Sequence, residues 1–171
     1  MEGCKLILDS GERREFASGA VRDVQEGKGR ADLLPLDVAA DLLDRAEDLE
    51  QDNGIHPLLS LSYFMGHTAD KEYVYNAIKE FSRRNGWNTY TMLLEVSKHF
   101  EEGAKKYGEH NWQKGIPAHC YIDSAVRHYL KHLRGDTDEP HDRAFVWNIL
   151  CCIWTCENKP ELNDYANTSK S

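Results

Sequence analysis

Apolar residues recur every three or four positions in five segments of the chain, which is the spacing of one face of an α-helix. Proline or a polar residue opens each segment, and Asn-Gly or glycine closes several of them, as is typical of helix ends. No segment alternates apolar and polar residues, so the sequence predicts an all-α fold. The predicted helices run from about Pro35 to Asn53-Gly54, Asp70 to Arg84, Asn88 to Tyr107, Pro117 to Gly135 and Pro140 to Glu157.

The apolar positions also predict which helix faces are buried. In helix 88–107 the core stripe is Met92, Val96, Phe100, Ala104 and Tyr107. In helix 117–134 the inward residues are Ile122, Ala125, Val126, Tyr129, Leu130 and Leu133. The last helix, 140–157, is apolar nearly all round, which predicts burial on every side, either at the centre of the bundle or at a subunit interface.

The remaining segments carry weaker patterns, and we treat residues 1–171 as one all-α domain. Residues 1–34 form an N-terminal arm with a glycine-rich basic loop. Residues 55–69 are a mixed connector with a short apolar patch, and the tail over 158–171 is expected to be frayed.

Composition and charge narrow the function classes. The 171 residues carry 21 Lys and Arg against 29 Asp and Glu, a formal net charge of -8, which argues against general nucleic-acid binding. No apolar run reaches the roughly 18 residues of a membrane span, and the start of the chain lacks a signal-peptide layout, so we expect a cytosolic protein. The five cysteines, Cys4, Cys120, Cys151, Cys152 and Cys156, are odd in number, so a disulfide framework is not expected. Three of them lie in one apolar segment and are interpreted as small buried core residues, with a zinc site at Cys152 and Cys156 as the alternative.

Helix 88–107 carries an acidic stripe beside its apolar face. Glu95, His99 and Glu102 lie at positions i, i+4 and i+7, so they share one side of the helix. Carboxylates flanking a histidine in this way can hold a divalent cation. The alternative is an ordinary solvated helix face with Glu-Lys pairs, which Glu102 and Lys106 also fit.

The next helix and the turn after it form the densest polar cluster. His128 and His132 are four residues apart on one flank, and Asp123 and Arg127 have the spacing of a structural ion pair on the other. The turn holds Asp136, Asp138, Glu139, His141 and Asp142 within seven residues. So many carboxylates repel one another unless a cation or protons relieve them, although some suit a helix N-terminus. Asn148, within the apolar helix, needs partners for its amide.

Two basic loops are candidates for binding an anionic ligand. Arg22, Lys28 and Arg30 alternate with glycines that let the backbone approach an anion, although flexible loops often have this composition. Lys105 and Lys106 precede Asn111-Trp112, where an exposed indole can stack on a base. The alternative is a tryptophan folded back onto the bundle.

Four segments together carry a resemblance to a known family: GAVRDVQEGKGRADLLP (19–35), EVSKHFEEGAKKYGEHNWQKGIP (95–117), DSAVRHYLKHLRGD (123–136) and DEPHDRAFVWN (138–148). They resemble the phage and prophage dATP/dGTP diphosphohydrolases, grouped with the MazG-like all-α nucleotide pyrophosphohydrolases. Residues 36–94 depart from this pattern and are interpreted as an inserted helical segment, with the catalytic core helices over 95–157.

The resemblance implies hydrolysis of a purine deoxynucleoside triphosphate to the monophosphate and pyrophosphate, with two or more Mg²⁺ or Mn²⁺ ions. MazG-like enzymes hold these ions with ExxE on one helix and ExxD on the next. Here Glu139 and Asp142 fit ExxD, whereas Glu95, His99 and Glu102 are not a clean ExxE, and Glu101 can replace Glu102. The implied metal ligands are Glu95, His99, Glu102, Asp138, Glu139, His141 and Asp142, and the implied catalytic residues are Glu95, His128 and Glu139.

The resemblance also implies roles for the basic and amide side chains. The implied phosphate-binding residues are Lys28, Arg30, Lys105 and Lys106. The implied base, sugar or other substrate contacts are Arg22, Asn111, Trp112, Arg127 and Asn148. We further expect a homo-oligomer, a dimer or tetramer, with helix 140–157 near the interface.

Two other functions fit parts of the sequence. His141-Asp142 is an HD pair, so an HD-type triphosphohydrolase is possible, with His128 upstream and Asp164 downstream as further ligands. A non-enzymatic interaction protein is the second alternative, in which the apolar helix 140–157 binds a partner.

Overall fold

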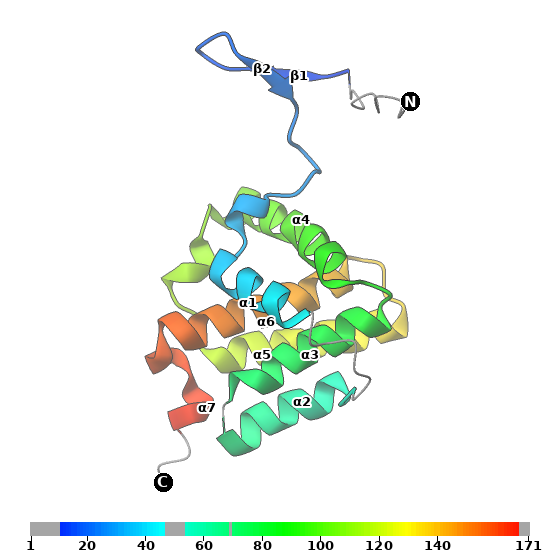
Figure 1. Cartoon of the computed structure of the whole chain (residues 1–171), viewed down its shortest axis with the longest axis vertical. Helices are drawn as coiled ribbons and strands as arrows, with labels where there is room; N and C mark the ends of the chain where they lie inside the picture. Colours follow the sequence, from blue (N-terminus) through cyan, green and yellow to red (C-terminus); the bar gives the residue numbers. More distant parts are fainter. Residues whose placement is uncertain (1–10, 47–53, 69, 168–171) are drawn as a thin grey trace.

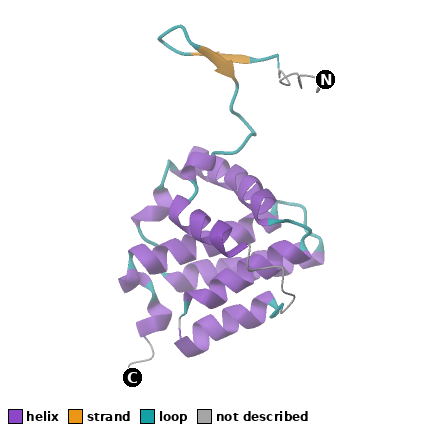
Figure 2. Cartoon of the chain, in the orientation of Figure 1, coloured by secondary structure: helices purple, strands orange, loops and turns teal. Residues whose placement is uncertain are grey.

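The computed structural model describes residues 11–46, 54–68 and 70–167. These residues form an all-α bundle with one short hairpin, which confirms the predicted fold class (Figures 1 and 2). The helices are α1 (Leu36–Ala46), α2 (Pro57–Tyr63), α3 (Lys71–Arg84), α4 (Thr89–Tyr107), α5 (Ala118–Arg134), α6 (His141–Asn158) and α7 (Asp164–Asn167). Shorter turns are η1 (Ala31–Leu33), the π-helical η3 (Phe64–Thr68), η4 (Asn111–Lys114) and η5 (Pro160–Leu162).

Local chemistry sets the helix ends where the sequence predicts them. The side chain of Asp70 accepts a hydrogen bond from the amide of Glu72 at the start of α3, and Asn88 accepts one from Thr91 at the start of α4. Gly135 adopts a left-handed conformation with φ 86° that ends α5. The predicted end of α1 over residues 47–53 lies outside the described residues.

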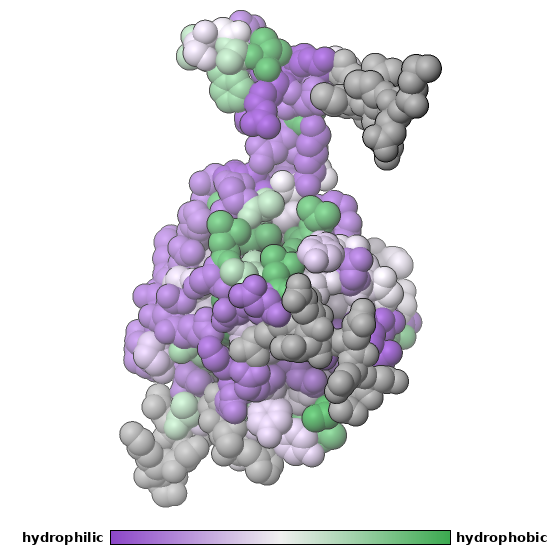
Figure 3. Space-filling model, viewed as in Figure 1, coloured by the Kyte–Doolittle hydropathy of each residue, from purple (hydrophilic) through white to green (hydrophobic). Residues whose placement is uncertain are grey.

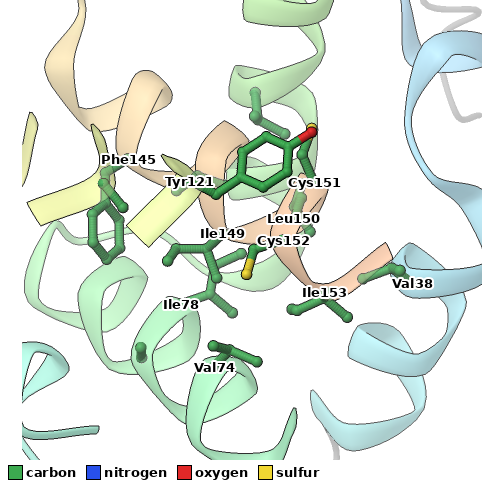
Figure 4. Close-up of a cluster of buried hydrophobic side chains, with 14 of the residues drawn as sticks. Val38, Val74, Ile78, Tyr121, Phe145, Ile149, Leu150, Cys151, Cys152 and Ile153 are labelled. Carbon is green, nitrogen blue, oxygen red and sulfur yellow. The ribbon is translucent and has the colours of Figure 1, made fainter. Parts of the chain in front are cut away.

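The core is built around α6, as one of the two interpretations of its apolar sequence predicts. Phe145, Ile149, Leu150 and Ile153 are fully buried. Figure 4 shows side chains of α1, α3 and α5 gathered around them, including Val38, Val74, Ile78 and Tyr121. Because other helices of the same chain cover α6, its burial gives no argument for a subunit interface.

The thiols of α6 are part of this core. Cys151 and Cys152 are buried and free, and Cys120 and Cys156 are free and partly buried. Burial raises the pKa of the Cys151 thiol well above its usual value. Cys151 and Cys152 therefore pack as small apolar side chains, as predicted, whereas Cys156 is only partly buried. Cys4 lies outside the described residues.

Three segments differ from the sequence prediction. The arm contains a hairpin of β1 (Arg13–Glu15) and β2 (Val21–Asp23), paired antiparallel. The connector over 55–69 is largely helical as α2 and η3, because its apolar residues Leu61 and Phe64 are buried in the bundle. The described part of the tail contains η5 and α7, and Asp164 accepts a hydrogen bond from the amide of His119.

Three residues predicted to be buried are exposed instead. Leu130 and Leu133 face outward because α5 packs through Ile122, Ala125 and Tyr129, a narrower contact than its apolar stripe. Tyr107 is exposed at the last position of α4, at the rim of a cavity described below. Among the described helices, none is both long and apolar enough to cross a bilayer.

Candidate active site

Two histidines and a glutamate converge where α5 and α6 meet. His128 Nδ1 lies 2.9 Å from His141 Nδ1, and Glu139 Oε1 lies 3.6 Å from each of these nitrogens. Gly135 ends α5 and Pro140 precedes α6, so the turn between them brings Glu139 and His141 back beside His128. The three ligand atoms are close enough to hold one metal ion.

The turn also fixes the orientation of His141. Its Nε2 lies 2.7 Å from Asp138 Oδ1, and its side chain is almost fully buried. A carboxylate at Nε2 favours the tautomer that carries the proton there and leaves the Nδ1 lone pair facing His128 and Glu139. The contact with His141, followed by Lys131, lowers the pKa of Asp138 to about 2.

A second group, Asp136, Asp138 and His141, also has the spacing of metal ligands. Its acidic members are already paired: Asp136 accepts a hydrogen bond of 2.7 Å from Arg134 Nε, and Asp138 lies 3.3 Å from Lys131 Nζ. The shared His141 uses Nε2 in this group and Nδ1 in the first. A cation would displace existing partners here, so the His128–Glu139–His141 group is the better candidate.

The other predicted metal ligands belong to neither group. Glu95 Oε2 accepts hydrogen bonds from Arg143, and Lys98 followed by Arg143 lowers the pKa of Glu95. Glu102 is exposed, and Asp142 accepts a hydrogen bond from the amide of Arg143 at the start of α6. The role of Glu95, Glu102 and Asp142 as metal ligands therefore stays a prediction, and the three-ligand groups of the described residues do not include them.

Arg143 was missed by the sequence analysis, although it is the one basic residue among the carboxylates of 136–143. Its guanidinium joins the start of α6 to Glu95 on α4 at 2.8 Å. This ion pair joins α4 to the start of α6, and it holds the charge of Arg143 within electrostatic reach of His99.

His99 lies on α4 within electrostatic reach of the same group. Burial, and then the positive form of His128, lowers the pKa of His99 to about 4. Its Nδ1 is buried and has no hydrogen-bond partner among the described residues. The ring is therefore neutral at pH 7, with one nitrogen that the protein leaves unsatisfied.

The protein should lose stability on acidification because of His99. The unfolded chain protonates this ring below pH about 6.5, whereas the folded protein resists protonation to about 4, so the proton favours the unfolded state. Between pH 7 and pH 4.5 we expect His99 to remove about 2–3 kcal/mol of unfolding free energy. Denaturant unfolding at both pH values measures it, and a His99→Phe variant should lack this share of the loss. An equal loss in both proteins would contradict the prediction.

Glu101 anchors the glycine-rich basic loop to α4. Its two carboxylate oxygens accept hydrogen bonds of 3.0 Å from the amide of Gly27 and 2.7 Å from that of Gly29. Gly29 sits so close to α4 that a Cβ there would lie 2.2 Å from Ser97 Oγ. Burial acts to raise the pKa of Glu101, but the two amides and Lys105 outweigh it and the pKa is lowered.

Removing this anchor should loosen the loop. Glu101→Ala is expected to lower the free energy of unfolding by about 1–3 kcal/mol and to speed hydrogen exchange at Gly27 and Gly29. Glu102→Ala, at the exposed neighbouring position, is the matched control and should leave both amides protected. Unchanged exchange in Glu101→Ala would show that the loop holds without the carboxylate.

Most of the predicted phosphate-binding cations are paired with carboxylates. Arg30 bridges Asp32 and Glu109, Lys105 contacts Glu26 and Glu101, Lys28 lies 3.7 Å from Asp23, and Arg127 pairs with Asp123 as the sequence suggested. Arg22 lies on the hairpin, which stands away from the bundle (Figure 1). The chain therefore does not bring Arg22 to the group of His128, Glu139 and His141, which we call the histidine group.

Lys106 has a different environment. Its Nζ lies 5.0 Å from the centre of the Tyr107 ring, within cation–π range. Tyr107, and more weakly the Glu139 carboxylate, raises the pKa of Lys106. Lys106 is thus the predicted phosphate-binding lysine that lies within electrostatic reach of the histidine group.

An apolar cavity of about 270 Å³ adjoins His99. Trp112 forms part of its wall but is buried, packed edge-on against Phe100 and Trp154, so the alternative of a tryptophan folded onto the bundle is correct. Asn148 is buried and donates a hydrogen bond to the Ala144 carbonyl, and it is not among the lining residues. The lining residues are Leu33, His99, Phe100, Gly103, Ala104, Tyr107, Gly108, His110, Asn111, Trp112, Ile116 and Trp147.

Comparison with known protein families decides the family of the chain. The family described as dATP/dGTP diphosphohydrolase, N-terminal, matches residues 68–165, more than half of the sequence. The chain belongs to the dATP/dGTP diphosphohydrolase family. No curated protein and no solved structure gave a match.

The matched region of this diphosphohydrolase family member contains the complete histidine group and most of the cavity wall. It also contains α3, so it overlaps the segment interpreted as an insertion over residues 68–94. The glycine-rich loop, whose residues contributed to the resemblance, lies before the match begins. The family name supports hydrolysis of dATP or dGTP at a diphosphate linkage.

Proposed function

We propose that this chain is a metal-dependent, MazG-like nucleotide diphosphohydrolase that converts dATP or dGTP to the monophosphate and pyrophosphate. The single observation that carries the proposal is the convergence of His128, Glu139 and His141 within the family-matched region. Two imidazoles and one carboxylate form a common metal-binding set, and each has a ligand atom close to the others.

The residues fit a divalent cation. Two Nδ1 atoms 2.9 Å apart can share one proton, or both lone pairs can bind one cation beside the Glu139 oxygen. Imidazole nitrogen suits first-row transition metals and carboxylate oxygen suits Mn²⁺ and Mg²⁺, so this mixed set favours Mn²⁺ over Mg²⁺. We propose that further ions are held through the substrate phosphates, because Asp136 and Asp138 are already paired with Arg134 and Lys131.

A bound divalent cation would polarise the phosphate and lower the pKa of a water molecule. The chain itself holds the reacting groups in place. Asp138 keeps the proton of His141 on Nε2, and Glu139 Oε2 is the acceptor that we propose for the proton of the attacking water. Arg143, positioned by Glu95, and Lys106 neutralise phosphate charge that metal does not.

The structure does not favour the HD-type alternative. Asp142 is absent from both candidate metal groups of the described residues, and Asp164 pairs with His119 near the C-terminal helix instead. An HD-type site needs both carboxylates together with the histidines. The non-enzymatic alternative does not explain why His128, Glu139 and His141 converge.

We also propose that the protein self-associates as a dimer or tetramer. Figure 3 shows an apolar area on the face that α1 and α4 present. Leu36 on α1 and Tyr90 and Leu94 on α4 each expose more than half of their side chains. Large apolar side chains gathered on a surface are typical of protein contacts, and light scattering of the purified chain tests the proposal.

Turnover of a panel of deoxynucleoside triphosphates tests the proposed function. We expect dATP or dGTP to yield monophosphate and pyrophosphate with Mn²⁺, more slowly with Mg²⁺, and not at all with EDTA. Ion-exchange chromatography resolves the products. Nucleoside plus triphosphate would indicate the HD-type reaction, and turnover that persists in EDTA would exclude the proposed site.

A further inference from the structure

The cavity beside His99 has the chemistry of a binding site for an aromatic, uncharged group. Its wall contains no Asp, Glu, Lys or Arg, so it offers nothing to a phosphate. It instead presents rings of Phe100, Tyr107, Trp112 and Trp147. At about 270 Å³ it is just below the roughly 300–1,000 Å³ of pockets that take whole drug-sized ligands. That size suits one part of a nucleotide.

We propose that this cavity binds the purine base of the substrate, with the imidazole of His99 and the amide of Asn111 contacting the base edge. The inference rests on the proposed function only in taking the substrate to be a nucleotide. Base stacking on aromatic side chains contributes about 1–3 kcal/mol per base, and an amide side chain provides both donors and an acceptor.

His99 supplies the polar contact that an apolar cavity otherwise lacks. Its Nδ1 is buried without a hydrogen-bond partner among the described residues, and leaving a polar atom in this state costs free energy. A neutral imidazole has one donor and one acceptor nitrogen, which matches the mixed donor and acceptor edge of a purine. A base in the cavity would therefore satisfy a group that the protein leaves unpaired.

Gly103 keeps the cavity open from the α4 side. Glycine inside a helix is less favourable than alanine by about 1 kcal/mol, so its presence in the middle of α4 needs a reason. A Cβ at Gly103 would meet no heavy atom within 4 Å, although the residue lines the cavity. Larger side chains would project into this space and reduce the volume for a ligand.

The position of the cavity agrees with a base bound beside the histidine group. His99 lines the cavity and lies within electrostatic reach of His128 and Glu139. Lys106 is next to Tyr107 at the rim and is influenced by Glu139. A nucleotide with its base among the rings would thus direct its phosphates toward Lys106 and the candidate metal ligands.

Nucleoside binding without metal tests the cavity separately from catalysis. Deoxyadenosine, deoxyguanosine and deoxycytidine are titrated in EDTA against the full chain, with calorimetry and tryptophan fluorescence as readouts. We expect saturable binding of at least one purine nucleoside, roughly tenfold tighter than deoxycytidine. Gly103→Leu should weaken it at least tenfold, whereas the matched control Gly103→Ala should leave it within about threefold and stabilise α4 by about 1 kcal/mol.

Circular dichroism checks that each variant folds. If Gly103→Leu does not fold, Asn111→Leu, in the part of the wall that η4 contributes, replaces it. His99→Phe keeps an aromatic ring at position 99 but removes its nitrogens, so it should reduce the preference for a purine nucleoside over deoxycytidine. Absence of saturable purine binding at millimolar concentration would overturn the proposal, as would full binding by the folded cavity-filling variant. Either result leaves metal-dependent turnover to be judged by the triphosphate panel, so the two failures are distinguishable.

Discussion

Glu139→Ala and His141→Ala are each expected to lower kcat/KM for dATP or dGTP by roughly a hundredfold or more, while the chain stays helical. Each change removes one of the three atoms that converge between α5 and α6. Both residues lie at the turn rather than in the apolar centre of the bundle, so the core around Ile149 remains packed. Steady-state kinetics in Mn²⁺ and circular dichroism measure the two effects.

Two further substitutions test whether the loss of activity is specific to this site. Asp138→Asn should cost about tenfold to a hundredfold, because Asp138 contacts His141 and orients its ring. Glu157→Gln is the matched acidic control, since Glu157 pairs with Lys71 at the other end of α6 and should keep full activity. Full activity in Glu139→Ala and His141→Ala would remove this turn from the mechanism.

Phe145→Ala is expected to lower the free energy of unfolding by about 3–5 kcal/mol. The Phe145 ring is fully buried, with its centre 4.3 Å from that of Phe81 on α3 and 5.5 Å from that of Tyr129 on α5. Truncation would leave a cavity where three helices meet. Denaturant unfolding at pH 7 measures the loss, and Leu133→Ala, at an exposed position of α5, is the control with little expected change.

A double-mutant cycle tests whether α3 and α6 stabilise the protein together. Phe81→Ala alone should destabilise the protein by a similar amount, and the two changes together should cost less than their sum by about 0.5–3 kcal/mol. That coupling is expected because Phe81 on α3 packs directly against Phe145 on α6, and the family match covers both helices. Strict additivity would mean that α3 packs independently of α6, as an inserted element would.

Much of the fold could be predicted because its signals are local. Capping by Asp70 and Asn88, and the left-handed Gly135, act within a few residues of the helix ends that they set. The apolar stretch of α6 predicted a helix buried on every side, and the structure places this helix at the centre of the bundle. The hairpin and α2 were not predicted, because such short elements depend on tertiary contacts that the spacing of apolar residues does not reveal.

The same difference between local signals and long-range contacts applies to the candidate site. Asp138, Glu139 and His141 could be predicted as a cluster because a turn keeps them together in sequence and in space. The contact of Glu95 with Arg143 could not be predicted, because this ion pair joins residues 48 positions apart. A helical wheel gives the face of a residue but not the element packed against it.

The loop anchor and the cavity show what periodicity cannot supply. Glu101 accepts hydrogen bonds from the backbone amides of Gly27 and Gly29. Every residue except proline has such an amide, so a hydropathy pattern cannot predict which amides are bound. The signal that was available is Gly103, because a glycine inside a strongly helical segment calls for a structural reason. Trp112 was ambiguous, since its aromatic partners come from α4 and α6.

The central claim is that His128, Glu139 and His141 hold the divalent cation, and a Mn²⁺-binding titration followed by electron paramagnetic resonance tests it most directly. We predict saturable binding of Mn²⁺ by the wild-type chain without nucleotide, weakened at least tenfold in His141→Ala and Glu139→Ala and unchanged in Glu157→Gln. Equal Mn²⁺ affinity in all four proteins would contradict the claim and place the metal elsewhere in the chain.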